Sequence, residues 1–230
     1  MAPRGPAGPP RRTGRPPGVR RPRPIAVFVA TRNPAKLREL EQLLAGTRLK
    51  PYGPDFIGRL PAAVEDAPTF EGNARKKALQ YSAHLRSFRS HRDDLVLADD
   101  SGLEIDALDG EPGVRSARLG GPSATDADRV RLVLRRMESV PWERRTARFH
   151  CVVAIALARH GEILASFSGV VEGLIAFEPK GSGGFGYDPI FFYPEAGMTF
   201  AEMTPEEKDS VSHRGQALER AVGWLRDYQK

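Results

Sequence analysis

Two adjacent aspartates, Asp99 and Asp100, follow directly on the apolar run of residues 95–98. Carboxylates at the end of a buried strand suit a magnesium ion, which prefers oxygen ligands and commonly takes one or two protein carboxylates together with water and substrate phosphates. Neighbouring residues of an extended strand point to opposite sides, so one aspartate is expected to hold metal while the other orients or deprotonates a water. Glu65 and Asp66 are further candidate ligands. Asp-Asp-Ser-Gly is also a common turn sequence, which leaves a plain turn as the alternative.

A candidate phosphate-binding turn lies between the first predicted strand and the first predicted helix, at Thr31-Arg32-Asn33-Pro34-Ala35-Lys36. Backbone N–H groups and the positive end of a helix attract an anion at such a junction, and Lys36, about one turn into the helix, adds a full charge. A capped helix with a surface lysine would have the same sequence. The turn therefore indicates a phosphate site only in combination with the acids.

A second set of basic residues, Arg75, Lys76 and Lys77, lies in the first half of a helix predicted from its N-cap Thr69 to about Leu85. Basic side chains beside metal-bound phosphates neutralise the charge that develops on a leaving group. A solvated helix face is an equal explanation of these three charges.

The glycine-rich segment Gly183-Gly184-Phe185-Gly186-Tyr187-Asp188 is a candidate site for a flat aromatic ligand. Phe185 between glycines has little to pack against locally, and an aromatic ring on such a backbone is a platform for a base. Asp188, His213 and Arg214 are candidates for reading the polar edge of that base. His213 stands beside Arg214 in a polar stretch and not on an apolar face, which favours a functional role.

The elements that would position these groups follow from the hydrophobic pattern. Strands are predicted at about residues 25–30, 49–52 and 95–98, and a hairpin of two long strands at about 146–158 and 162–177. Helices are predicted to begin near Pro34, Thr69, Thr125 and, with a capping box to Glu207, Thr204. Compact apolar strands alternating with helices indicate an α/β fold with a mixed sheet flanked by helices.

The net charge of +6 is concentrated in an N-terminal extension. Residues 1–24 hold seven arginines and no acidic residue, so the rest of the chain carries a net charge of −1. This Pro/Arg/Gly-rich segment lacks an apolar periodic face and is expected to be a disordered extension of a single enzyme domain, residues 25–230. A near-neutral domain argues against nucleic acid as a partner. A protein that binds nucleic acid through the extension is the alternative.

Cys151 is the only cysteine and lies in an apolar run, which excludes an intrachain disulfide and a multi-cysteine zinc site. This pattern indicates a buried thiol in a reducing cytoplasm. No apolar run approaches the roughly 20 residues that span a bilayer, and residues 1–24 lack the apolar stretch of a secretory signal. We therefore expect a cytoplasmic protein without a membrane partner.

In this order and spacing the segments resemble the inosine triphosphate pyrophosphatase family over residues 25–228. The matching motifs are residues 30–36, 69–74 with Lys77, 98–103, 112–118, 184–191, 207–208 and 212–215. The resemblance implies a two-lobed α/β fold, with a mixed sheet flanked by helices and a cleft between the lobes, in a homodimer that uses Mg²⁺. It also implies hydrolysis of inosine, deoxyinosine and xanthosine triphosphates to the nucleoside monophosphate and pyrophosphate.

The same resemblance implies roles for individual residues. Asp100 matches the proton acceptor and is taken with Lys77 as catalytic, and the implied magnesium ligands are Glu65, Asp99 and Asp100. The residues that match the triphosphate site are Thr31, Asn33, Lys36 and Ser101. The nucleoside pocket is matched by Phe185, Gly186, Tyr187, Asp188, Lys208, His213 and Arg214. Because Asp66 adjoins Glu65, the choice between these two as metal ligand stays open.

Discrimination among purines is expected at position 6, where hypoxanthine and xanthine present a carbonyl and adenine an amino group. Arg214 and backbone N–H groups would donate to the carbonyl, and a site built on such hydrogen bonds rejects the wrong group strongly. Guanine keeps the carbonyl, so its rejection must come from position 2, and the sequence does not indicate how. An alternative function on a similar fold is hydrolysis of modified pyrimidine nucleoside triphosphates, which a substrate panel would separate.

Overall fold

The structure, a computed structural model, describes residues 24–31, 34–57 and 62–228. Residues 1–23 of the predicted extension and Asn33 of the predicted phosphate-binding turn lie outside the described residues. Within the described ranges, none of the helices combines the length and the apolar character that crossing a bilayer would need.

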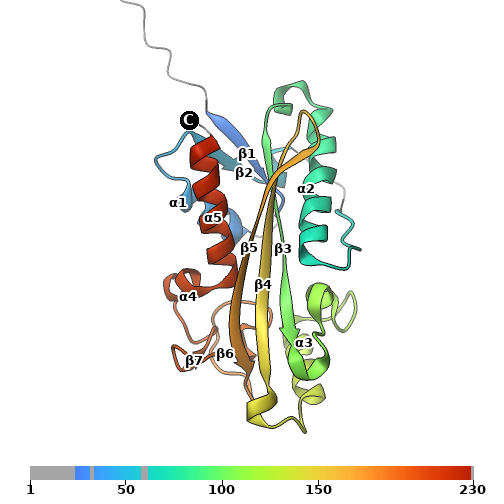
Figure 1. Ribbon diagram of the computed structural model, residues 1–230, viewed down its shortest axis with the longest axis vertical. Helices are drawn as coiled ribbons and strands as arrows, with labels where there is room; N and C mark the ends of the chain where they lie inside the picture. The colour runs from blue at the N-terminus through green and yellow to red at the C-terminus, as the bar shows by residue number, and fades with distance from the viewer. Residues whose placement is uncertain (1–23, 32–33, 58–61, 229–230) are drawn as a thin grey trace, which may run out of the picture.

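Among the described residues, seven strands form one mixed sheet in the order β2-β1-β3-β4-β5-β6-β7 (Figure 1). The strands are β1 (Ile25–Val29), β2 (Leu49–Tyr52), β3 (Leu95–Ile105), β4 (Thr146–Leu157), β5 (Glu162–Ile175), β6 (Phe191–Tyr193) and β7 (Met198–Thr199). β1 pairs in parallel with β2 and β3, whereas the pairs from β3 to β7 are antiparallel. The predicted mixed sheet and the long hairpin, now β4 and β5, are confirmed.

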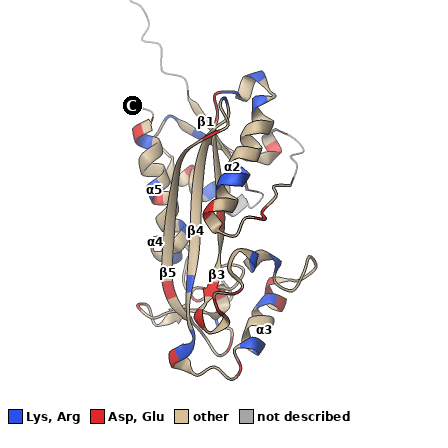
Figure 2. Cartoon of the chain, turned by 45° about the vertical axis from the view of Figure 1, so that its right-hand side comes forward, with Lys and Arg blue, Asp and Glu red and all other residues tan. Residues whose placement is uncertain are grey.

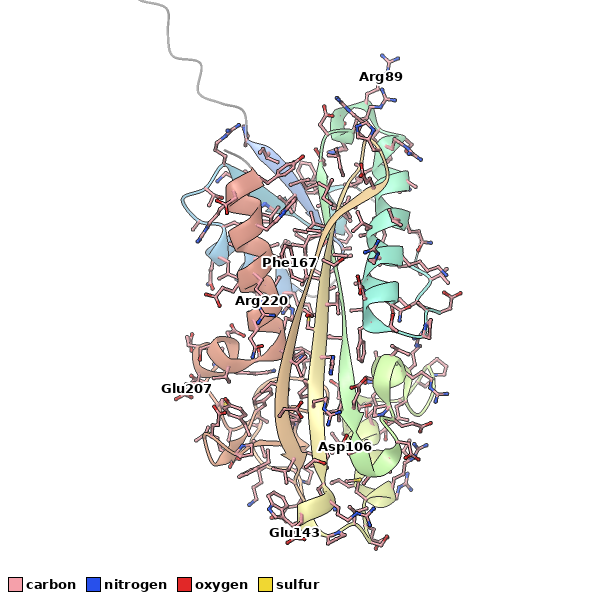
Figure 3. The ribbon with its side chains drawn as sticks, viewed as in Figure 1. Arg89, Asp106, Glu143, Phe167, Glu207 and Arg220 are labelled. Carbon is pink, nitrogen blue, oxygen red and sulfur yellow. The ribbon has the colours of Figure 1, made fainter. Side chains whose placement is uncertain are left out.

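Helices cover both faces of the sheet, with α1 and α5 on one face and α2 on the other (Figure 1). The helices are α1 (Pro34–Leu43), α2 (Phe70–Arg86), α3 (Asp126–Arg136), α4 (Pro205–Val211) and α5 (His213–Tyr228). On the α5 face, Phe167 of β5 packs against Trp224, and the Arg220 guanidinium donates a hydrogen bond to the Ser168 carbonyl (Figure 3). The predicted caps at Thr69, Thr125 and Thr204 are all present.

The apolar core separates into two ends along the sheet, which are the two predicted lobes. Successive side chains of a strand point to opposite faces, so at one end Val27 and Leu97 pack toward α1 and α5, while Phe28 and Val96 pack toward α2. At the other end α3 packs over β3, β4 and β6 around Phe191. Both faces of β1 are covered, which is why its sequence is an uninterrupted apolar run.

The strand that carries the aspartates is longer than the sequence predicts. β3 continues through Asp99 and Asp100 to Ile105, because β4 pairs with it over its whole length, with Asp100 opposite Val152 and Ile105 opposite Ala147. The prediction that the aspartates stand at the end of their strand is therefore wrong, and so is the alternative that they form a turn.

The strand that ends beside the two aspartates is β1, the parallel neighbour of β3. Val29 pairs with Leu97, and the Ala30 N–H donates the last hydrogen bond to the Leu97 carbonyl at 2.8 Å. In the part of the chain that the structure describes, no strand continues this pairing along β3. Asp99 and Asp100 therefore lie in mid-strand but beside the carboxyl end of a parallel strand, where the sheet opens on one side.

A buried arginine joins the end of α3 to the end of β5. Arg145 is only 1% exposed, and its guanidinium donates to four backbone carbonyls. These are the carbonyls of Met137 at 2.7 Å, Val140 at 3.1 Å, Ile175 at 2.6 Å and Ala176 at 3.0 Å. Burial lowers the pKa of Arg145. This side chain thus supplies donors to backbone carbonyls at and just beyond the ends of the helix and the strand.

Candidate active site

The two aspartates of β3 point to opposite faces of the sheet, as predicted for neighbouring strand residues. Asp99 lies on the α1 and α5 face, where its Oδ2 accepts a hydrogen bond from Lys36 Nζ at 2.7 Å and lies 3.8 Å from Arg214 Nε. Burial would raise the pKa of Asp99, but the positive charges of Lys36, Arg214 and Lys77 outweigh it and hold the pKa below its usual range. Asp99 is therefore a buried, permanently charged carboxylate.

Asp100 lies on the α2 face and has fewer compensating partners. Its Oδ2 accepts a hydrogen bond from Asn73 Nδ2 at 3.0 Å. The pKa of Asp100 is raised to about 6, because burial and the nearby carboxylates of Glu65 and Asp99 together outweigh the opposing effects of Asn73 and Lys77. A carboxylate whose pKa lies near neutrality is suited to accept a proton in a reaction.

The raised pKa of Asp100 can be tested by a pH titration in the absence of substrate. In the protein without added metal, we expect the carboxyl carbon resonance of Asp100 to titrate with a midpoint near pH 6. The charged form, which is the base, is then lost as the pH falls through 6. Because Asn73 stabilises the charged form, Asn73→Ala should move the midpoint upward. A midpoint near 4 in the wild-type protein would contradict this assignment.

Lys77 lies on the side of α2 that faces β3, near Asp99 and Glu65. Its ammonium donates to the backbone carbonyl of Asp99 at 2.9 Å and pairs with Glu65 at 2.5 Å. Burial alone would lower the pKa of Lys77, but Asp99, Glu65 and Asp100 raise it, so the ammonium is retained. Of the three basic residues predicted for this helix, only Lys77 faces the aspartates.

The other two basic residues of α2 lie on its solvent side. Arg75 pairs with Glu71, and Lys76 pairs with Asp66. Asp66 is therefore turned away from β3, whereas Glu65 faces Lys77 and acts on the charge of Asp100. The structure thus brings Glu65 to the aspartates and leaves Asp66 outside, whereas the choice between them as metal ligand stays a prediction.

A cavity of about 300 Å³ adjoins Asp99 on the α1 and α5 face of the sheet. Residues from both lobes line it, beginning with Lys36 of α1 and Ser101 of β3. Its other walls come from Ser116 and Ala117, from Asp126 and Arg129 of α3, from Phe149, from residues 185–188, and from Lys208 and His213. The predicted cleft between the lobes is therefore present, and Lys36 in its wall pairs with Asp99.

Phe185 stands at this cavity, as predicted for a base platform. Its ring is 55% exposed, and the Lys208 ammonium lies 4.6 Å from the ring centroid. Asp188 fixes the loop, because its Oδ2 accepts hydrogen bonds from the Phe185 N–H at 2.7 Å and from Lys208. Gly184 has a positive φ of 70°, and a side chain there would collide with Asp188. The glycines thus allow a tight loop around a buried carboxylate.

Asp188 lines the cavity, and its predicted role in reading the edge of a base stays a prediction. Asp188 is only 2% exposed, and its Oδ2 accepts hydrogen bonds from its own loop and from Lys208. Burial raises its pKa, with Lys208 opposing the shift. We infer that Asp188 also positions Phe185 and Lys208 at the cavity.

His213 forms part of the cavity wall opposite the glycine-rich loop. It is 8% exposed and stacks on Phe149, with ring centroids 4.7 Å apart and planes 11° from parallel. The pKa of His213 is lowered to about 3, by burial first and then by the positive charges of Lys208, Lys36 and Arg214. The ring is therefore neutral, and its buried Nδ1 has no hydrogen-bond partner among the described residues. A neutral, unpartnered nitrogen in this wall is available to a ligand.

The remaining predicted residues fall into two groups. Ser101, Gly186 and Tyr187 line the cavity, although the Tyr187 hydroxyl already donates to the Ser116 carbonyl at 2.8 Å. Thr31 lies two residues beyond the end of β1, and its N–H donates a hydrogen bond to the Val29 carbonyl at 2.8 Å. Arg214 lies beside Asp99, with Nε 3.8 Å from Asp99 Oδ2, and its predicted role toward a base stays a prediction.

Sequence reasoning missed Asn73, Phe149, Asp126 and Arg129 as site residues. Asn73 and Lys77 share the inward stripe of α2 with Phe70, Ala74 and Ala78. Two polar residues on an otherwise apolar stripe were the signal available in the sequence. Phe149, Asp126 and Arg129 carry no such signal, because they reach the cavity only through strand pairing and the packing of α3.

The comparisons with known proteins agree with this geometry. A model of the Ham1 family matches residues 27–224. The chain belongs to the Ham1 family. Two Ham1 relatives are proteins named dITP/XTP pyrophosphatase. The one from Geobacter sulfurreducens is 46% identical over 201 residues, which cover 86% of this chain and 96% of the relative. The one from Halalkalibacterium halodurans is 45% identical over 198 residues, which cover 86% and 97%.

Among solved structures, the HAM1 protein from Coxiella burnetii matches this Ham1 chain with a TM-score of 0.79 at 40% identity. The match covers 88% of this chain and 99% of that protein. The family resemblance identified from the sequence motifs is thereby confirmed, together with the fold class.

Proposed function

We propose that this protein hydrolyses deoxyinosine, inosine and xanthosine triphosphates to the nucleoside monophosphate and pyrophosphate. The observation that carries the proposal is the arrangement of the site, in which a cavity lined by Phe185, His213 and Phe149 reaches Lys36, whose ammonium pairs with Asp99, the neighbour of Asp100 in β3. A base in the cavity would place its phosphates beside the lysines. The names of the Ham1 relatives support the same purine substrates and do not favour modified pyrimidines.

The reaction in this proposal is attack of water on the α-phosphorus, with pyrophosphate leaving. Asp100, whose pKa lies near 6, accepts the proton of the water. Lys36 and Lys77 hold the phosphates and neutralise charge on the leaving group. Both ammonium groups are already fixed by carboxylates, Lys36 by Asp99 and Lys77 by Glu65. Little rearrangement is then needed when the substrate binds.

A magnesium ion fits this set of side chains as a partner of the substrate. Among the described residues, no three His, Cys, Asp or Glu side chains form a metal-binding group by themselves. Magnesium commonly takes only one or two carboxylates and completes its shell with water and phosphate oxygens. We propose that Asp100 holds the ion with Glu65 nearby, whereas Asp99, predicted as a further ligand, points to the opposite face of the sheet and is already paired with Lys36. When bound, the ion would supply charge that polarises the triphosphate. Asp100, with one hydrogen-bond donor and a raised pKa, has the unmet demand for positive charge.

The decisive experiment is product analysis with inosine triphosphate and magnesium in ¹⁸O-labelled water. We expect inosine monophosphate and pyrophosphate, with the label in the monophosphate, because water attacks the α-phosphorus. Orthophosphate as the product, or label in the pyrophosphate, would refute the proposed bond cleavage. Preference for a modified pyrimidine nucleoside triphosphate in the same assay would favour the alternative substrate class.

Lys36→Ala should mainly weaken binding of the triphosphate. We expect the KM to rise by about tenfold or more, since a charge-assisted contact to phosphate is lost. The variant should also be less stable than the wild type, because buried Asp99 loses the ammonium 2.7 Å away. The matched control is Lys50→Ala, at an exposed position of β2. An unchanged KM with a lowered kcat would contradict the binding role.

We further propose that the protein acts as a homodimer in the cytoplasm, as the resemblance implies. The buried single thiol of Cys151 supports a reducing compartment. Basic and acidic residues are interspersed along α3 and α5 (Figure 2), which supports a small-molecule substrate over a nucleic-acid partner. Light scattering tests the dimer. Deletion of residues 1–24 tests whether the extension contributes to turnover, and we expect it not to.

A further inference from the structure

One wall of the cavity is formed by an ion pair on α3. Arg129 Nη1 donates to Asp126 Oδ1 at 2.7 Å, and Asp126 Oδ2 accepts a hydrogen bond from the Gly186 N–H at 2.8 Å. Asp126 therefore ties Arg129 to the glycine-rich loop that carries Phe185. Both residues of the pair line the cavity together with Phe185 and His213.

Arg129 retains donor capacity at this wall. Its side chain is 16% exposed, and its Nε is buried with no hydrogen-bond partner among the described residues. A guanidinium has five N–H donors and no acceptor. A ligand that offers an acceptor here is stabilised, whereas one that offers an amino group brings two donors together and leaves both unpaired.

Several other polar groups in the cavity already have partners, with His213 Nδ1 as an exception among the described residues. The Tyr187 hydroxyl donates to the Ser116 carbonyl, the Ser116 hydroxyl donates to the Gly113 carbonyl at 2.6 Å, and Lys208 pairs with Asp188. Lys208 of α4 and His213 of α5 line the cavity from elements other than α3. Arg129 is therefore a separate donor, which could meet an edge of the base that those two residues do not contact.

We propose that Arg129 recognises position 2 of the purine. Its guanidinium would donate a hydrogen bond to the carbonyl of xanthine, and it has no acceptor for the amino group of guanine. This inference rests on the proposed function. With the phosphates at Lys36, the sugar-distal ring of the purine, which carries positions 2 and 6, enters the cavity. Position 6 is a carbonyl in hypoxanthine, xanthine and guanine alike and cannot distinguish guanine. A donor-only group at position 2 favours xanthine, tolerates the C–H of hypoxanthine and disfavours guanine.

The test compares Arg129→Met with the wild type on xanthosine, inosine and guanosine triphosphates, using kcat/KM for pyrophosphate release. Arg129→Met should lower kcat/KM for xanthosine triphosphate by about tenfold or more, since a charge-assisted hydrogen bond is lost. It should change the value for inosine triphosphate by less than about threefold, and raise that for guanosine triphosphate. Arg131→Met, on the solvent side of the same helix, is the matched control and should leave all three values unchanged.

Arg129→Gln provides a second readout that does not depend on the first variant folding well. Glutamine can donate to Asp126 while presenting an amide oxygen to the amino group of guanine, so we expect a larger gain for guanosine triphosphate than with methionine. Equal losses for xanthosine and inosine triphosphates would overturn the inference, as would unchanged ratios. If the wild-type protein releases no pyrophosphate from either, the proposed function fails instead.

Discussion

Asp100→Asn should lower kcat by about a hundred- to ten-thousandfold, the range expected for loss of a general base. The amide has nearly the shape of the carboxylate and can still accept the hydrogen bond from Asn73, so the site should keep its geometry. Stability should not fall. Burial holds the pKa of Asp100 near 6 in the folded protein, so the ionised carboxylate costs free energy at pH values above 6. Steady-state kinetics and thermal unfolding of the same preparation check both expectations.

The matched control is Asp93→Asn, an exposed aspartate that pairs with Arg159 far along the strand from the site. It should leave kcat and stability near the wild-type values. Asp100→Asn with nearly normal turnover would remove Asp100 as the base. A large loss of stability in that variant would instead show that the carboxylate supports the fold, contrary to its raised pKa.

Arg145→Met should lower the free energy of unfolding by about 3–5 kcal/mol, because it leaves several buried carbonyls without donors. Methionine fills much of the volume but donates nothing to Met137, Val140, Ile175 or Ala176. Because these carbonyls lie at the ends of α3 and β5, the lobe that forms one wall of the cavity should loosen. Urea denaturation at constant pH measures the change.

Arg144→Met is the paired control, since Arg144 is the exposed neighbour of Arg145. A surface substitution of this kind usually changes stability by less than about 0.5 kcal/mol. The loss of stability in Arg145→Lys should lie between those of Arg145→Met and Arg144→Met, because an ammonium reaches fewer carbonyls than a guanidinium. A loss below about 1 kcal/mol for Arg145→Met would show that water or a shifted backbone satisfies the carbonyls.

Much of the fold follows from local sequence signals. The apolar run of β1 and the capping residues Thr69, Thr125 and Thr204 each depend on a few adjacent residues, and each was predicted correctly. The extent of β3 was not, because Asp99-Asp100-Ser101-Gly102 has turn composition and only its partner β4 keeps it extended. The alternation of Leu103 and Ile105 with polar residues was a weak sign that the strand continues.

Some features of the candidate site likewise follow from local sequence, and others depend on contacts between distant segments. The opposite orientation of Asp99 and Asp100 follows from strand geometry, and the glycines around Phe185 indicated a specialised loop. The placement of Arg214 beside Asp99, and of Asp126 against the Gly186 N–H 60 residues away, depends on how distant elements pack. No local pattern encodes such a contact, so a sequence without its structure cannot supply it.

Where β1 ends, the Lys77 ammonium takes the place of a strand N–H as hydrogen-bond donor to the edge of β3. The Leu97 carbonyl receives the Ala30 N–H, and two residues later, on the same edge, the Asp99 carbonyl receives Lys77. Acetylation of Lys77 would therefore do more than remove a charge near the phosphates. It would also free a backbone acceptor at the edge of β3, and faster amide hydrogen exchange there would report the damage.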